Sequence, residues 1–248
     1  MRSRLFPDFN LANFAMVAMG KLASGLAVWM LLINAAFALQ VNGCGTVGEG
    51  ILVDYRMAKS EVNSAANAAA RKMLHTIEYV HFTTPVETLQ SGFASKLPGP
   101  DITYTLQRVP NHYRALLSMV SLGEREKTSK PPGSEYSLEC WFQRGVAIFP
   151  DDNTVRMLYA QYLYKSSRDK EAEAQLGVAS RQAADNAFTL NNIGLVYFDA
   201  KNYEQSLLHA HKAYALGLGN MILKEQLKSA GKWEEPAEAP QAEPAKKP

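Results

Sequence analysis

Cysteine and histidine are both scarce in this chain. Its 248 residues include two cysteines, Cys44 and Cys140, and five histidines. Two cysteines can form one disulfide bridge but are too few for a zinc site built from cysteines. The remaining composition is that of a folded protein, because 47% of the residues are hydrophobic and 10% are aromatic. We therefore expect a genuine core, arranged as one domain or two small ones.

A surplus of either charge is also missing. The chain has 26 Lys and Arg against 24 Asp and Glu, which gives a formal net charge of +2. Residues 1–38 contain Arg2, Arg4 and Lys21 against Asp8, so the rest of the chain holds 23 basic and 23 acidic side chains. This balance provides no electrostatic footprint for nucleic acid, and we expect no nucleic-acid partner.

The motifs of common enzymes are absent too. The sequence has no serine in a nucleophile elbow, no HExxH motif and no phosphate-binding glycine loop. His75, Glu78 and His81 follow one another at spacing three and could share a helix face, so a small metal-dependent enzyme is an alternative. His209 and His211 are two apart, and on a helix their side chains point about 200° apart. We expect no catalytic residue, no metal site and no cofactor.

An apolar run occupies residues 22–38, LASGLAVWMLLINAAFA, which follow Lys21 and end in Ala36-Phe37-Ala38. A basic residue, an apolar stretch and a small-residue ending are typical of a secretory signal peptide. We predict that residues 1–38 are such a peptide and that the mature protein is periplasmic or secreted. An uncleaved membrane anchor is the alternative, because the run is near the lower length limit for crossing a bilayer.

Cys44 lies just beyond this run, in Val41-Asn42-Gly43-Cys44. The tetrapeptide resembles in part the site of lipoproteins, so a membrane-anchored lipoprotein that assists assembly of a pilus, polysaccharide or outer-membrane complex is an alternative. Two thiols in an oxidising compartment tend to pair, however. We predict a disulfide between Cys44 and Cys140, which closes a long loop and stabilises the fold by on the order of 4 kcal/mol in the chain-entropy model.

An internal repeat appears when residues 150–182 are aligned with residues 184–216. Small residues recur at matching positions: Ala160 and Gly194, Ala172 and Ser206, and Ala179 and Ala213. The apolar spacing predicts helices over about 153–166 and 169–182. Neither helix could bury its apolar stripe alone, so the units must stack.

The repeat extends in both directions from this pair. Pro110 precedes Pro150 by one repeat plus an insertion of six, and Pro-Pro-Gly at 131–133 makes that insertion a loop. A further helix begins at Thr84, and a last helix over about 220–231 caps the stack. We expect an N-terminal cap segment at 39–83, a helical repeat domain at 84–232 and a disordered tail at 233–248.

Three polar features are expected to be structural. Asp101 can cap the helix of residues 102–109, and Asn111 can cap the helix that follows it. Asp54-Tyr55-Arg56 is expected to form an ion-paired corner that packs the N-terminal segment on the stack.

The second copy of the repeat contains Asn192-Ile193-Gly194, followed by Tyr197, Tyr203 and Ala213. This pattern resembles the tetratricopeptide repeat (TPR), whose first helix carries an Asn-Leu-Gly motif and whose second helix packs a small residue against it. The resemblance implies an all-α, TPR-like α-solenoid of antiparallel helix pairs. Residues 76–160 also resemble a group of uncharacterised exported repeat proteins of proteobacteria, for example at Cys140-Trp141-Phe142. That group has no assigned reaction.

In stacked helical hairpins the first helix of each pair lines the concave side, and its outward residues contact peptides or partner helices. We therefore expect an exported scaffold or adaptor of the bacterial cell envelope that binds a protein partner, and not an enzyme. Membrane contact is expected only if Cys44 is lipidated or the leader is uncleaved. The expected partner-binding residues are Arg114, Met157, Gln161, Tyr164, Asn191 and Phe198, with Phe188 and Leu195 either binding or packing.

Overall fold

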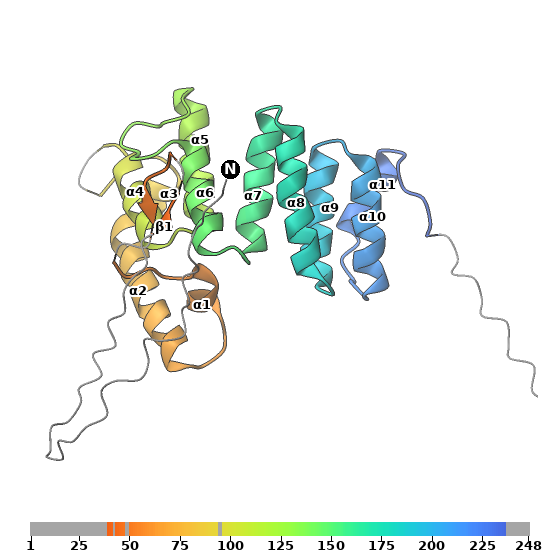
Figure 1. The fold of residues 1–248 in the computed structure, drawn as a ribbon, viewed down its shortest axis with the longest axis horizontal. Coiled ribbons are helices and arrows are strands. Elements are labelled where there is room, and N and C mark those ends of the chain that lie inside the picture. The colour runs from red at the N-terminus through yellow and green to blue at the C-terminus, as the bar shows by residue number, and fades with distance from the viewer. Residues whose placement is uncertain (1–38, 42, 48–49, 94–95, 237–248) are drawn as a thin grey trace, which may run out of the picture. The chain divides into compact units, whose positions relative to one another are not determined.

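The computed structural model describes residues 39–41, 43–47, 50–93 and 96–236. These residues belong to one compact unit and contain eleven α-helices and one two-stranded antiparallel sheet (Figure 1). The expected all-α class is confirmed. Within the described ranges, no helix is long and apolar enough to cross a membrane. The predicted signal peptide and residues 237–248 of the predicted tail lie outside the described residues.

Four helices in the second half repeat at a fixed interval. They are α7 (Asn153–Lys165), α8 (Asp169–Ala183), α9 (Ala187–Asp199) and α10 (Tyr203–Ala215). The step from the start of α7 at 153 to that of α9 at 187 equals the step from α8 at 169 to α10 at 203. The helices expected over about 153–166 and 169–182 are confirmed. Each of the four packs against the next one in sequence, and Figure 1 shows them side by side.

Small residues allow these helices to approach closely. The fully buried alanines include Ala160, Ala172, Ala179 and Ala213. The tightest position is Gly194, where an added Cβ would lie 2.6 Å from Leu223 Cδ2. The Ser206 hydroxyl donates to the carbonyl of Gly194 at 2.9 Å. Leu223 belongs to α11 (Ile222–Ser229), which packs on α9 and α10 at the end of the stack.

The helices of the first half are less regular. They are α1 (Tyr55–Lys59), α2 (Ala65–His81), α3 (Thr84–Glu87), α4 (Gly99–Arg108), α5 (Tyr113–Glu126) and α6 (Leu138–Ile148). The helix expected to begin at Thr84 is a single turn, because Leu89 adopts a left-handed φ of 61° just after it. The expected insertion loop is present between α5 and α6, and it begins at Lys127, also left-handed at φ 52°.

Two helix caps differ from the expectation. The cap of α5 is His112 and not Asn111: Nδ1 of His112 accepts a backbone N–H of the first turn at 3.1 Å. Helix α4 begins at Gly99, so Asp101 lies inside its first turn and accepts from the Phe93 N–H at 2.8 Å. Neither the Asn111 nor the Asp101 side chain caps its expected helix, because each binds a residue outside that helix.

Asn111 joins the N-terminal segment to the helical stack. Its Oδ1 accepts the Tyr55 N–H at 2.9 Å, and its amide donates to Asp54 and Asp152 at 2.8 Å each. Arg56 donates to Asp54 at 2.7 Å and to Asp151, before α7, at 2.9 Å, and its Nε lies 3.5 Å from Asp152 Oδ2. The predicted ion-paired corner at residues 54–56 is therefore confirmed.

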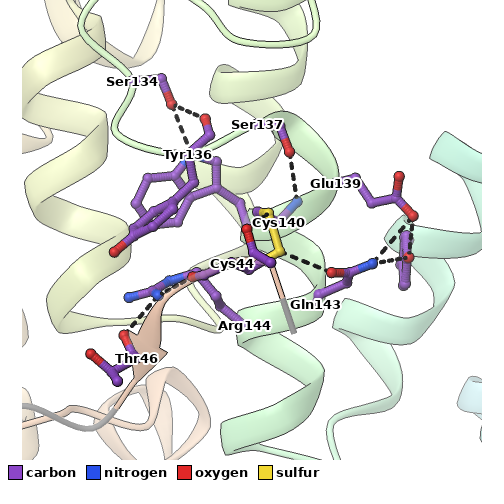
Figure 2. Close-up of a disulfide and its surroundings, with 12 residues drawn as sticks. Cys44, Thr46, Ser134, Tyr136, Ser137, Glu139, Cys140, Gln143 and Arg144 are labelled. Carbon is purple, nitrogen blue, oxygen red and sulfur yellow. Dashed lines mark hydrogen bonds between the residues drawn. A yellow bond between two sulfur atoms is a disulfide. The ribbon is translucent and has the colours of Figure 1, made fainter. Parts of the chain in front are cut away.

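A short hairpin at the N-terminal end of the described chain is tied to α6. Strands β1 (Leu39–Gln40) and β2 (Thr46–Val47) flank the turn that carries Cys44. The sulfur of Cys44 is bonded to that of Cys140 on α6, so the predicted disulfide is present in the structure (Figure 2). Cys44 itself is buried, and Gln143 Oε1 lies 3.0 Å from its sulfur.

A buried arginine reinforces this attachment. Figure 2 shows Arg144 reaching from α6 to the hairpin, where Nη1 donates to the carbonyls of Cys44 and Thr46 at 2.8 Å each. Its guanidinium lies 4.1 Å from the centre of the Tyr136 ring. Gly45 must be a glycine here, because its φ is 70° and an added Cβ would lie 2.9 Å from the Tyr136 hydroxyl.

The described residues form one large apolar cluster that spans both halves and two smaller ones at its ends. The large one extends from Phe82 on the α2 side through Trp141 to Leu218. A smaller one lies among α1, α2 and the end of α4 and consists of Val53, Tyr55, Ala58, Leu74, Ile77 and Val109. Trp233, which the sequence assigned to the tail, packs against a third cluster around α10 and α11. The N-terminal segment therefore has a core of its own.

Candidate binding groove

A groove of about 480 Å³ crosses the surfaces of α5, α7 and α9. Its size is that of a pocket able to hold several side chains of a ligand. The lining residues come from α5, α6, α7, the start of α8, α9 and the turn after α9: Leu117, Val120, Phe142, Leu158, Gln161, Tyr162, Tyr164, Lys165, Asp169, Val196, Asp199, Ala200 and Lys201. We refer to this site as the α5–α7–α9 groove.

The lining of the α5–α7–α9 groove is apolar, with charges of both signs beside it. The Phe142 ring lies 5.4 Å from that of Tyr159 and 5.5 Å from that of Tyr162, so aromatic packing holds this part of the lining in place. Leu117 remains 45% exposed. Lys165 forms an exposed ion pair with Glu124 at 2.8 Å. Such a lining suits a ligand with apolar groups on a polar backbone.

Gln161 and Tyr164, two of the expected binding residues, do line this groove. The Tyr164 hydroxyl is buried and has no hydrogen-bond partner among the described groups. Its burial raises the pKa of the phenol, so the hydroxyl keeps its proton at any physiological pH.

Met157 and Asn191, two more of the expected binding residues, lie away from solvent. Met157 is 8% exposed and belongs to the large core, and Asn191 is 4% exposed. The physical reason is that Met157 on α7 and Asn191 on α9 occupy the same position of the repeat. Since α7 packs against both α5 and α9, that position faces a neighbouring helix. The Asn191 Oδ1 has no hydrogen-bond partner among the described residues.

The last two expected residues lie elsewhere on the surface. Arg114 forms a two-bond ion pair with Glu87, including Nε to Oε1 at 2.7 Å, and its guanidinium lies 5.4 Å from the centre of the Phe82 ring. Phe198 lines a separate, more open hollow beside α11. Of the two residues left between binding and packing, Phe188 is exposed, and Leu195 packs against the cluster around α10 and α11.

Other groove residues were missed by the sequence analysis. On α7 they include Leu158 and Lys165, which share a helix face with Gln161 because the spacings are three and four residues. On α5 they are Leu117 and Val120, at spacing three. Extending the i, i+3, i+4 pattern from Gln161 would have found the two on α7.

The histidines considered as metal ligands have other partners. His81 Nδ1 lies 2.9 Å from Asp101 Oδ1, and Glu78 Oε1 lies 3.2 Å from His112 Nε2. The His75 ring stacks on the ring of Tyr79, one helical turn later. His75, Glu78 and His81 do not converge, and the part of the chain that is described contains no group of three His, Cys, Asp or Glu arranged to hold a metal.

His112 is neutral in this arrangement. Its Nδ1 accepts the helix-cap hydrogen bond, so Nε2 carries the proton and donates it toward Glu78. Burial lowers the pKa of His112, and the hydrogen bond from His112 lowers the pKa of Glu78. The pair is therefore an ionised carboxylate with a neutral imidazole.

Comparison with known proteins does not extend this picture: no protein-family model matches the chain, and no curated protein and no solved structure shows a significant match to it.

Proposed function

We propose that this chain is an exported TPR-like α-solenoid that acts as a scaffold or adaptor of the bacterial cell envelope. Its partner is an extended protein segment held in the α5–α7–α9 groove. The observation that carries the proposal is the groove itself, because it runs across helices that occupy corresponding places in successive helix pairs. The constant interval between helix starts and the small residues at the helix crossings support the TPR-like assignment.

The chemistry of the lining favours a peptide as the occupant. A peptide has apolar side chains and a backbone whose N–H and C=O groups need partners. The groove offers both, with the apolar side chains of Leu158 and Phe142 beside the Gln161 amide. The nearby Lys165 and Asp199 can select the charge of the bound segment.

A display selection with a matched pair of variants tests this function. Peptides are selected on the wild-type protein, and their affinities are then measured for Leu117→Glu and Leu208→Glu. The two leucines are exposed to similar extents, 45% and 43%, but only Leu117 lines the groove. We expect Leu117→Glu to weaken binding by at least tenfold and Leu208→Glu to leave it within twofold. Equal affinities for the two variants would place the peptide site elsewhere.

The disulfide supports the exported form over the lipoprotein form. Disulfides persist in oxidising compartments, and the bridge uses the same Cys44 sulfur that a lipid would modify. Intact mass spectrometry of the protein from its own cell envelope, without reductant, tests this part. We expect a chain that starts at Leu39 and is two hydrogens lighter than the dithiol form. A chain that starts at a lipid-modified Cys44 would contradict it.

A further inference from the structure

A second apolar hollow lies at the opposite end of the described chain from α11. Its volume is about 550 Å³, and it lies between α2 and α4, beside the extended residues that precede α1. The lining residues are Ile51, Ala69, Lys72, Met73, Thr76, Ile77, Tyr104 and Arg108. None of them lines the α5–α7–α9 groove, so we treat this α2–α4 groove as an independent site.

The floor of the α2–α4 groove is the outer side of the small N-terminal core. Ile77 is a member of that core, and Met73 packs against it while remaining partly exposed. Ile51 is 66% exposed although it is fully apolar. The main chain before α1 is fixed nearby, since the Val53 N–H donates to the carbonyl of Arg108 at 2.9 Å. Apolar surface in this groove is therefore exposed to solvent, while the small core and the Val53–Arg108 hydrogen bond hold the surrounding chain in place.

The charge of this groove is of one sign. Among the described residues, Lys72 and Arg108 line it and no carboxylate does. Neither cation forms an ion pair with any described residue, whereas Lys165 beside the α5–α7–α9 groove is paired with a glutamate. The Arg108 guanidinium lies 5.6 Å from the centre of the Tyr104 ring, which orients it and leaves its N–H groups for an anion. In a chain with almost balanced charge, two cations that have no carboxylate partner among the described residues favour an anion beside this apolar hollow.

The lining also argues against a peptide in this groove. It contains no amide side chain, and the hydroxyl of Thr76 already donates to the carbonyl of Lys72 at 3.0 Å. The lining can donate to backbone carbonyls, but it offers the N–H groups of a peptide only the hydroxyl oxygens of Thr76 and Tyr104, so a backbone laid here would replace only part of its hydrogen bonds to water. An acyl chain has no such groups, and its carboxylate head would meet the two cations.

We propose that the α2–α4 groove binds a single-chain anionic amphiphile, with the acyl chain along Met73 and Ile77 and the carboxylate between Lys72 and Arg108. This site is additional to the proposed peptide groove, and neither proposal depends on the other.

Titration with monomeric dodecanoate tests the proposal on the full-length mature chain. Isothermal calorimetry should give one site per chain. Octanoate should bind much more weakly, because each buried methylene strengthens binding by up to about fourfold. The double variant Lys72→Gln/Arg108→Gln should lose at least tenfold in affinity, with an unchanged helical circular dichroism spectrum. Lys130→Gln/Arg181→Gln, which removes the same charge from exposed positions outside the groove, should bind as the wild type does.

Three outcomes would overturn the proposal. Dodecanol binding as tightly as dodecanoate would show that the cations play no part. Acetate or inorganic phosphate binding as tightly would show that the apolar floor plays none. Sedimentation of the protein with anionic phosphatidylglycerol vesicles, without binding of monomeric dodecanoate, would show that this face contacts a membrane surface instead.

Discussion

Reduction of the Cys44–Cys140 disulfide should lower the stability of the protein without unfolding it. The two cysteines are 96 residues apart, and closing a loop of that size restricts the unfolded chain by about 4.7 kcal/mol at 25 °C in the chain-entropy model. For a domain of this size, each kcal/mol corresponds to roughly 2–4 °C in melting temperature. We therefore expect Tm to fall by roughly 10–20 °C. The fold should persist at room temperature because the large core lies outside the hairpin.

The assay is thermal unfolding followed by far-ultraviolet circular dichroism, with and without reductant. Cys44→Ser/Cys140→Ser should match the reduced wild type and should not respond to reductant. Serine is a suitable replacement at 44 because its hydroxyl can donate to Gln143 Oε1, which lies 3.0 Å from the present sulfur. Equal Tm values for the oxidised and reduced proteins would refute the loop-closure reasoning. Complete unfolding on reduction would show instead that the main core requires the hairpin.

Two further predictions concern packing and pH. Gly194→Ala should lower the free energy of unfolding in urea by about 1–3 kcal/mol, because the added Cβ would crowd buried Leu223. Gly177→Ala is the control. It should raise the free energy of unfolding by about 0.4–1 kcal/mol, since its added Cβ meets only Arg181 Nη1 at 3.6 Å. Equal effects would show that the crossing of α9 with α11 is not tight. Burial holds the pKa of His112 below its usual 6.5, so on acidification His112 of the unfolded chain takes up a proton before His112 of the folded chain does. The contribution of His112 to the free energy of unfolding is therefore complete above pH 6.5 and declines as the pH falls through the folded-state pKa. His112→Asn keeps a cap acceptor for α5 and should flatten the decline of Tm between pH 7 and 5; an unchanged slope would assign the acid sensitivity to other groups.

The helices of the second half could be predicted from the sequence because the features that define them are local. The constant repeat interval and the small residues at its helix crossings predicted α7 and α8 within a residue or two. The details of the first half could not be predicted, because they depend on contacts between residues that are distant in sequence. Asn111 has a good capping sequence, but its side chain is used by Asp54 and Asp152, 57 and 41 residues away. A single sequence gives no signal for such a partner.

The candidate groove was predicted only in part, for a related reason. Helical spacing identifies which residues of α7 share a face, but not how far that face turns toward α5 and α9. Gln161 and Tyr164 line the groove, while Met157 on the same helix is covered by its neighbours. The α2–α4 groove had no sequence signal, since Lys72 and Arg108 are brought together only by the packing of α2 on α4.

The long separation of the two cysteines has a consequence for biosynthesis. Cys44 is made 96 residues before Cys140, which at ordinary elongation rates of roughly 5–20 residues per second is an interval of about 5–20 s. During that interval the nascent chain carries one thiol and no intramolecular partner for it. The chain contains no third cysteine, so an oxidant that arrives early can only join Cys44 to another molecule or oxidise the lone thiol itself. The intramolecular bridge can form only after α6 has been made.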